Sequence, residues 1–181
     1  LSREFAHTRR KNLLLRDLDE LVNQQLAKML FANPQRIDYY DRYQEIIDAY
    51  NAEQNRATIE KTFMDLMELA SSLDTEQQRY VREGFSSDEE LSVYDLLFSE
   101  NLTKQEIETI KKVSVDLLIK IKQQIAKLDH WTDKQETKAI VDNLIRNTLW
   151  QELPNSYDVS DIQTYQKKIY EYVYMRYPEV A

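Results

Sequence analysis

The chain has 181 residues, a net charge of −8, one glycine and no cysteine. The lack of cysteine excludes disulfides, thiolate nucleophiles and zinc sites with cysteine ligands, and it favours a reducing compartment. The single glycine, Gly84, excludes folds built on tight β-hairpins and on glycine-rich phosphate-binding loops.

The sequence shows neither a membrane span nor a signal peptide. No segment approaches the roughly 20 apolar residues that cross a bilayer, and the first residues lack the apolar centre of a signal peptide. We therefore expect a soluble, untargeted protein. Because the chain begins at Leu1 within a helical pattern, we also expect it to be a piece of a longer protein.

Acidic residues concentrate in the middle of the chain. Six basic and sixteen acidic residues give residues 35–101 a net charge of −10. This region would repel DNA, so it faces either solvent, which is the default, or a basic protein partner.

The first helical pattern covers residues 3–31, where leucine, valine and methionine recur every three or four positions after the basic cluster Arg9-Arg10-Lys11. Asn33 followed by Pro34 is a helix-start signal and predicts a second helix to about Glu53. We interpret residues 1–33 as the end of a preceding helical domain and residues 34–181 as a C-terminal helical domain.

Helix-start and helix-stop signals then divide the rest of the chain. Further helices are predicted at about 58–73, at 75–83 before Gly84, at 87–98 from a Ser87 capping box, at 103–128 from a Thr103 capping box, at 132–153 from Thr132 with Gln135, and at 158–177 from Asp158 or Ser160. The prediction is an all-α fold: a compact array of about six or seven helices without a sheet.

The sequence offers little for catalysis or metal binding. Its two histidines, His7 and His130, have no ligand at a spacing that would build a metal site on one helix face. Asp133 followed by Glu136 and Lys138 resembles a nuclease arrangement, but that arrangement belongs on strands and these residues open a helix. We therefore predict no catalytic residue, no metal and no cofactor in this chain.

Lysines on the predicted helix 103–128 are candidates for contact with duplex DNA. Spacings of seven and eleven residues are close to whole helical turns, so the lysines form rows that flank the apolar stripe. The alternative, which we favour from the residues alone, is that they only solubilise an amphipathic helix. The candidates are Lys104, Lys111 and Lys122 on one flank, Lys120 and Lys127 on the other, and Lys112 pointing outward.

Five of the twelve tyrosines fall between Tyr165 and Tyr177. Aromatic rings beside basic residues can stack on bases, but no sheet or barrel platform is predicted here. We therefore favour the interpretation that these tyrosine rings are half-buried in the protein and that their hydroxyl groups stay in contact with solvent.

Several ordered blocks resemble one known family. The run from Leu91 to Phe98, the run from Leu128 to Lys138, the block Asn143 to Leu149 and the tyrosine-rich end are similar to the C-terminal region of the motor, or R, subunit of type I restriction enzymes, especially its IC subfamily. The resemblance covers most of residues 36–181. The matching family positions are Asp129, Trp131, Lys134, Gln135, Thr137 and Arg146.

The resemblance implies that the chain comes from a larger subunit in the bacterial cytoplasm. That subunit would contain a nuclease domain and two ATP-driven translocase domains that use ATP and Mg. Its helical regions would dock it on the methyltransferase core, which consists of modification and specificity subunits. None of the nuclease or motor motifs occurs here. The matching positions are then structural or face a partner, and Arg146 is expected to pair with Asp129 or Asp142 and hold helices in register.

The leading hypothesis is therefore a non-catalytic module that docks the subunit and helps to guide duplex DNA. Two alternatives stay open: a pure protein-interaction domain without DNA contact, and a stand-alone helical regulator unrelated to restriction. The hypothesis that the chain is an enzyme in its own right is the least favoured. No contact with a membrane is expected.

Overall fold

A computed structural model describes residues 11–53 and 55–178, and in these ranges every regular element is a helix. This confirms the predicted all-α class, with seven helices of seven or more residues in the described ranges and no strand. The elements are α2 (Lys11–Ala32), the 3₁₀ helix η1 (Pro34–Arg36), α3 (Ile37–Ala52), α4 (Arg56–Gln77), α5 (Arg79–Arg82), α6 (Asp88–Leu97), α7 (Lys104–Ile125), α8 (Gln135–Glu152) and α9 (Val159–Arg176). The predicted helix over residues 3–31 has its first eight residues outside the described ranges, and His7, Arg9 and Arg10 lie there too.

The chain divides into two compact units, Leu1–Gly84 and Phe85–Ala181. This division differs from the predicted boundary between residues 33 and 34. The physical reason is that α2 shares its core with α3 and α4: Val22 and Leu26 are buried in one cluster with Phe63 and Leu66. Gly84, with a φ of +84°, stands at the end of the first unit.

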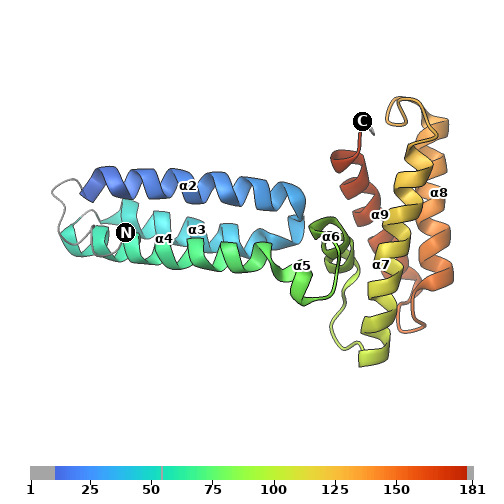
Figure 1. Ribbon diagram of the computed structural model, residues 1–181, viewed down its shortest axis with the longest axis horizontal. Helices are drawn as coiled ribbons and strands as arrows, with labels where there is room; N and C mark the ends of the chain where they lie inside the picture. The colour runs from blue at the N-terminus through green and yellow to red at the C-terminus, as the bar shows by residue number, and fades with distance from the viewer. Residues whose placement is uncertain (1–10, 54, 179–181) are drawn as a thin grey trace. The chain divides into compact units, whose positions relative to one another are not determined.

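In the N-terminal unit, α2 lies alongside α3 and α4 (Figure 1). The Asn33 side chain accepts a hydrogen bond from the backbone N–H of Gln35 at 3.1 Å, as expected from the Asn-Pro signal. The helix α4 continues through Thr75, where a separate helix had been predicted to begin. The Thr75 hydroxyl donates to the Ser71 carbonyl within α4 instead of capping a new helix.

In the C-terminal unit, α7, α8 and α9 run side by side, with α6 packed against α7 and α9 (Figure 1). A capping box opens α7 at Thr103, as predicted. Another opens α9 at Asp158, which was one of the two caps predicted for this helix. The predicted cap at Thr132 is not formed, because α8 begins after Lys134, which provides no side-chain cap. The largest fully buried side chains of this unit include Leu91, Leu97, Ile110, Leu117, Ile121, Ile125 and Trp131.

The described helices include none that combines the length and the apolar character needed to cross a membrane.

Candidate functional site

Five of the six candidate lysines lie on α7, whereas Lys127 follows the end of this helix at Ile125. Three of the five contact other helices of the same unit. Lys120 forms an ion pair with Glu152 of α8, and Lys122 forms one with Glu89 of α6. The Lys122 ammonium also lies 5.2 Å from the centre of the Tyr177 ring. Burial is the largest influence on the Glu89 carboxyl and acts to raise its pKa, but the Lys122 ammonium, the Tyr177 hydroxyl and the Arg176 charge together hold the pKa below its ordinary value.

The third of these lysines, Lys111, stands over two aromatic rings. Its ammonium lies 5.9 Å from the ring centres of both Phe85 and Tyr94, within the range of cation–π attraction. Lys111, Lys120 and Lys122 therefore tie α7 to its neighbours, in accordance with a structural role.

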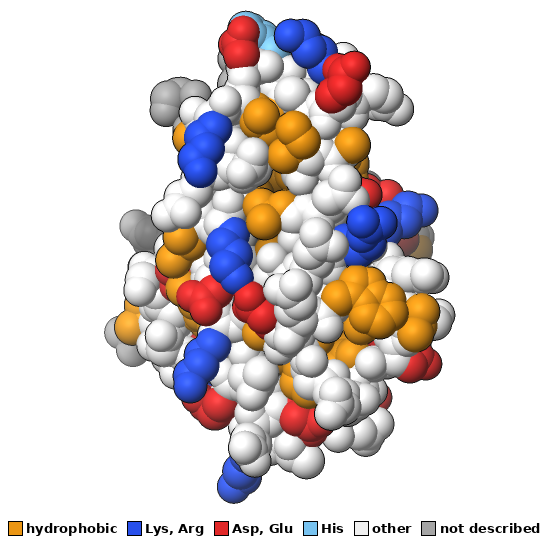
Figure 2. All heavy atoms as spheres, turned by 90° about the vertical axis from the view of Figure 1, so that its right-hand side faces the viewer, with side chains coloured by type: hydrophobic (Ala, Val, Ile, Leu, Met, Phe, Trp, Pro, Cys, Tyr) orange, Lys and Arg blue, Asp and Glu red, His pale blue; other side chains and the backbone are white. Residues whose placement is uncertain are grey.

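The other three candidates, Lys104, Lys112 and Lys127, are exposed. They form no ion pair with any of the residues that the structure describes. Figure 2 faces the side of the C-terminal unit on which α8 lies, and on it acidic side chains lie among the basic ones. Basic side chains therefore do not form a continuous stripe on this face.

The loop between α7 and α8, residues 126–134, carries three of the six family-matching positions, and α8 carries the other three. Trp131 is buried in it, with only 1% of its surface exposed. Its indole Nε1 donates a hydrogen bond to the Tyr177 carbonyl at 2.6 Å, and its ring meets those of Tyr170 and Tyr174 edge to face, with centres 6.2 and 5.7 Å apart. Trp131 therefore fastens the loop to α9.

Thr137 fixes the other end of the loop. Its hydroxyl oxygen lies 2.7 Å from the Trp131 carbonyl oxygen and 2.9 Å from the Lys134 carbonyl oxygen, so it is placed to donate to either. The first turn of α8 thereby holds the loop that precedes it. Trp131 and Thr137 have structural roles.

The remaining matching positions, Asp129, Lys134, Gln135 and Arg146, have exposed side chains. The predicted pairing of Arg146 with Asp129 or Asp142 is not formed among the described residues. The Arg146 Nη2 donates to Asn143 Oδ1 at 2.7 Å instead, because position 146 lies on an exposed face of α8 and not on its apolar face. Asp142 accepts a hydrogen bond from Gln166 of α9 at 2.9 Å.

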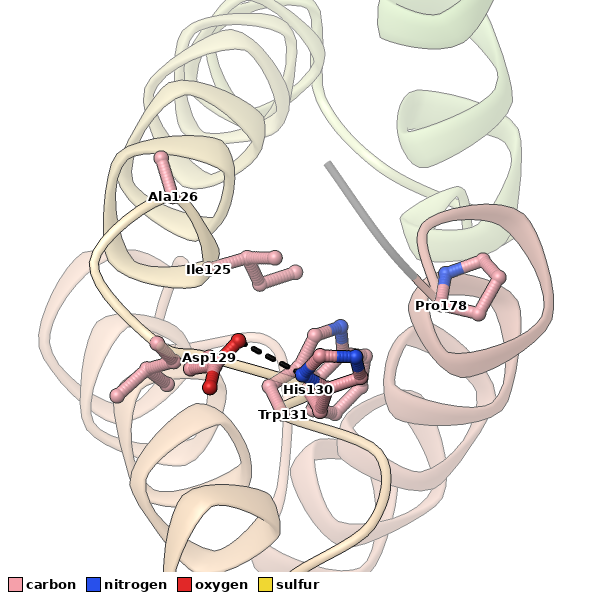
Figure 3. Close-up of a pocket in the computed structure, with 7 residues that line it drawn as sticks. Ile125, Ala126, Asp129, His130, Trp131 and Pro178 are labelled. Carbon is pink, nitrogen blue, oxygen red and sulfur yellow. Dashed lines mark hydrogen bonds and ion pairs between the residues drawn. The ribbon is translucent and has the colours of Figure 1, made fainter. Parts of the chain in front are cut away.

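A cavity of about 180 Å³ opens beside this loop (Figure 3). Asp129 and His130 line it from the loop and Pro178 from the opposite side. The His130 Nδ1 lies 2.7 Å from Asp129 Oδ1, and His130 has a φ of +46°, which is uncommon for a residue other than glycine. Within the described ranges, no group of three potential metal ligands is assembled here or elsewhere.

The residues that resembled a nuclease arrangement lie nearby. Asp133 is in the loop, and Glu136 and Lys138 are in the first turns of α8. The Lys138 ammonium stands 5.8 Å from the centre of the Tyr174 ring, so its visible contact is with an aromatic side chain.

One exposed face of α8 was missed from the sequence. Ile140, Asn143, Asn147 and Trp150 follow each other at intervals of three, four and three residues, on the side of α8 away from its buried residues. The same intervals could have identified this face once the buried stripe of α8 had been assigned.

A family model described as "Type I restriction enzyme HindI endonuclease subunit-like, C-terminal" matches residues 1–177. Neither the curated proteins nor the solved structures give a match. The family model spans both compact units, so the resemblance noted for residues 36–181 extends to the N-terminal helices. The chain belongs to the family of C-terminal regions of type I restriction enzyme endonuclease subunits that are similar to the HindI subunit.

Proposed function

We propose that this region is a non-catalytic assembly module that docks the endonuclease subunit on the methyltransferase core. The observation that carries the proposal is the division of the family-matching positions. Trp131 and Thr137 hold the loop between α7 and α8 in place, while Asp129, Lys134, Gln135 and Arg146 are displayed on the surface. Exposed charged and polar residues on a fixed loop and on the helix that follows it are suited to recognition of a protein partner.

The wider context belongs to the same proposal. The parent subunit would be an ATP-dependent, site-specific nuclease and DNA translocase of the bacterial cytoplasm, with ATP and Mg bound outside this region. The similarity to the IC subfamily is part of the proposal as well. A regulator unrelated to restriction does not agree with the family that the chain belongs to.

The test compares the full-length endonuclease subunit with a version that lacks this region. Sedimentation velocity with purified methyltransferase core should show the full subunit entering the complex and the shortened subunit sedimenting apart from it. Circular dichroism and ATP binding of the shortened subunit control for misfolding. Equal incorporation of both proteins would refute the docking role.

A second candidate function, guiding duplex DNA, rests on the three exposed lysines. Lys104, Lys112 and Lys127 are the appropriate positions to test, because reversal at Lys120 or Lys122 would break internal ion pairs. Each phosphate contact contributes about 0.9 to the slope of log affinity against log salt, so reversing three contacts should lower the slope by roughly 2.7 in the assembled enzyme.

A control for this experiment is charge reversal at Lys167 and Lys168, two exposed lysines of α9 whose contacts with Glu171 and the Tyr165 ring stay within that helix. If the variant with all three lysines reversed assembles normally and its salt slope is unchanged, the DNA-guiding role is refuted. The region would then be a pure protein-interaction domain.

A further inference from the structure

The outward face of α8 has the spacing of a helix-packing seam. The helix buries Val141, Ile145, Thr148 and Leu149 in its own unit. On the other side, Ile140 and Trp150 are 42% and 47% exposed, with Asn143 and Asn147 between them. Intervals of three, four and three residues place all four side chains along one line, as at the contact positions of paired helices.

This face is almost free of charge. Between Glu136 and Glu152, the exposed residues of α8 are Ala139, Ile140, Asn143, Arg146, Asn147, Trp150 and Gln151, and only Arg146 is charged. Charged residues make up 31% of the whole chain, so the depletion is local. Depletion of charge around exposed Trp and Arg is typical of the centre of a protein interface, whereas a surface for duplex DNA is rich in Lys and Arg.

Arg146 is the one charged residue exposed on α8 between Glu136 and Glu152, and it has no carboxylate partner in the described ranges. Its single visible side-chain partner is the neutral Asn143. The nearest acid along the helix, Asp142, is engaged by Gln166. The Arg146 guanidinium can therefore exchange its bond to neutral Asn143 for one to a carboxylate of a partner protein. Hydrogen bonds between a guanidinium and a carboxylate are charge-assisted and stronger than those between a guanidinium and a neutral amide.

We propose that the outward face of α8 packs against an acid-bearing helix of the methyltransferase core. This inference rests on the proposed docking function and names the surface that performs it. Ile140 and Trp150 contact apolar side chains of the partner helix, Arg146 binds its carboxylate, and the two asparagines set the register, as polar residues do at contact positions of paired helices.

The test uses the full-length endonuclease subunit and the purified core, with affinity measured by biolayer interferometry. The substitutions Trp150→Ala and Arg146→Glu should each weaken binding by about tenfold or more. Met175→Ala is the matched control, because Met175 is an apolar residue of α9 that is 70% exposed, and its truncation should change the affinity less than about twofold. Thermal unfolding followed by circular dichroism verifies that each variant is folded.

A photo-crosslinking residue placed at position 147 identifies the partner segment. A crosslink to a helix of the core that contains Asp or Glu supports the proposal, and a crosslink to a segment without acidic residues overturns it. The same residue at position 175 is the control.

The outcomes separate this inference from the docking function itself. If both substitutions leave the affinity unchanged while the subunit without this region fails to bind, docking occurs on another surface and only the inference about α8 fails. If the shortened subunit still binds the core, the docking function fails and the inference fails with it. If Arg146→Glu lowers the salt slope of DNA binding but leaves the affinity for the core unchanged, the face contacts DNA and the inference is overturned.

Discussion

The indole N–H of Trp131 is bonded to the backbone carbonyl of Tyr177, 46 residues further along the chain, at 2.6 Å. This bond joins the loop after α7 to the C-terminal end of α9. Both tryptophans, Trp131 and Trp150, lie in the unit Phe85–Ala181, so tryptophan fluorescence reports on this unit alone.

Replacing Trp131 by Phe should lower the free energy of unfolding of the C-terminal unit by about 1–3 kcal/mol, because the Tyr177 carbonyl loses its donor. Replacing it by Ala should cost roughly 3–5 kcal/mol, since a buried aromatic ring is lost as well. Urea unfolding followed by the fluorescence of Trp150 measures both changes. A cost below about 0.5 kcal/mol for the Phe variant would show that this bond contributes little.

Among the described residues of the N-terminal unit, Glu76 is the acid that is buried. Its carboxylate accepts from Arg36 Nε at 3.0 Å and from Arg79 Nε at 2.8 Å, and the Arg36 side chain is 3% exposed. The change Glu76→Gln removes the charge that balances buried Arg36 and should destabilise this unit by about 3–5 kcal/mol. Hydrogen exchange of the amides of α4 is the measurement.

The control for that experiment is Glu68→Gln. Glu68 pairs with Arg42 at 2.8 Å, but its side chain is 72% exposed, so the loss should stay under about 1 kcal/mol. Equal losses in the two variants would contradict the role assigned to Glu76.

Acid should destabilise the C-terminal unit in part through Glu89. Its pKa in the folded protein lies below the ordinary value of 4.5, so its contribution is present above that value and is lost as the pH falls through the folded-state pKa. Between pH 7 and pH 3, Glu89→Gln should therefore lose less stability than the wild type, by tryptophan fluorescence in urea. The control Glu136→Gln changes the same charge at an exposed position. Parallel pH profiles for wild type and Glu89→Gln would argue against this linkage.

Charge reversal should also distinguish the lysines of α7 by their effect on stability. Lys122→Glu places an acid beside Glu89 and removes the cation from the Tyr177 ring, with an expected cost of roughly 1–2 kcal/mol to the C-terminal unit. Lys112→Glu, at an exposed position, should stay within about 0.5 kcal/mol. Urea unfolding measures both, and an equal effect would mean that Lys122 is a surface residue like Lys112.

Features that depend on neighbouring residues were predictable from the sequence. The capping box predicted at Thr103 needs only residues three positions apart, and it is formed. Of the two caps predicted for the last helix, Asp158 is the one that forms. Features that depend on distant residues could not be predicted from the sequence. The boundary at Gly84 follows from the packing of α2 on α4, and α4 extends through Glu76, whose carboxylate binds Arg36 forty residues away.

The candidate site shows the same distinction. The sequence predicted lysine rows along the flanks of an apolar stripe, but it could not predict that Lys122 and Lys120 pair with Glu89 and Glu152, because these acids come from other helices. The cap expected at Thr132 was replaced by bonds of the Thr137 hydroxyl, because the buried Trp131 determines the path of the loop. The exposed positions of Arg146 and Trp150 became evident only when the buried side of α8 was known.

The anchoring of the loop between α7 and α8 has a kinetic consequence. Because Trp131 and Thr137 already hold this loop, a partner that binds Asp129, Lys134 or Gln135 does not have to order it first. The conformational entropy lost on association is correspondingly small. Substitutions of these exposed residues should therefore change the lifetime of the complex with the core much more than the rate at which it forms.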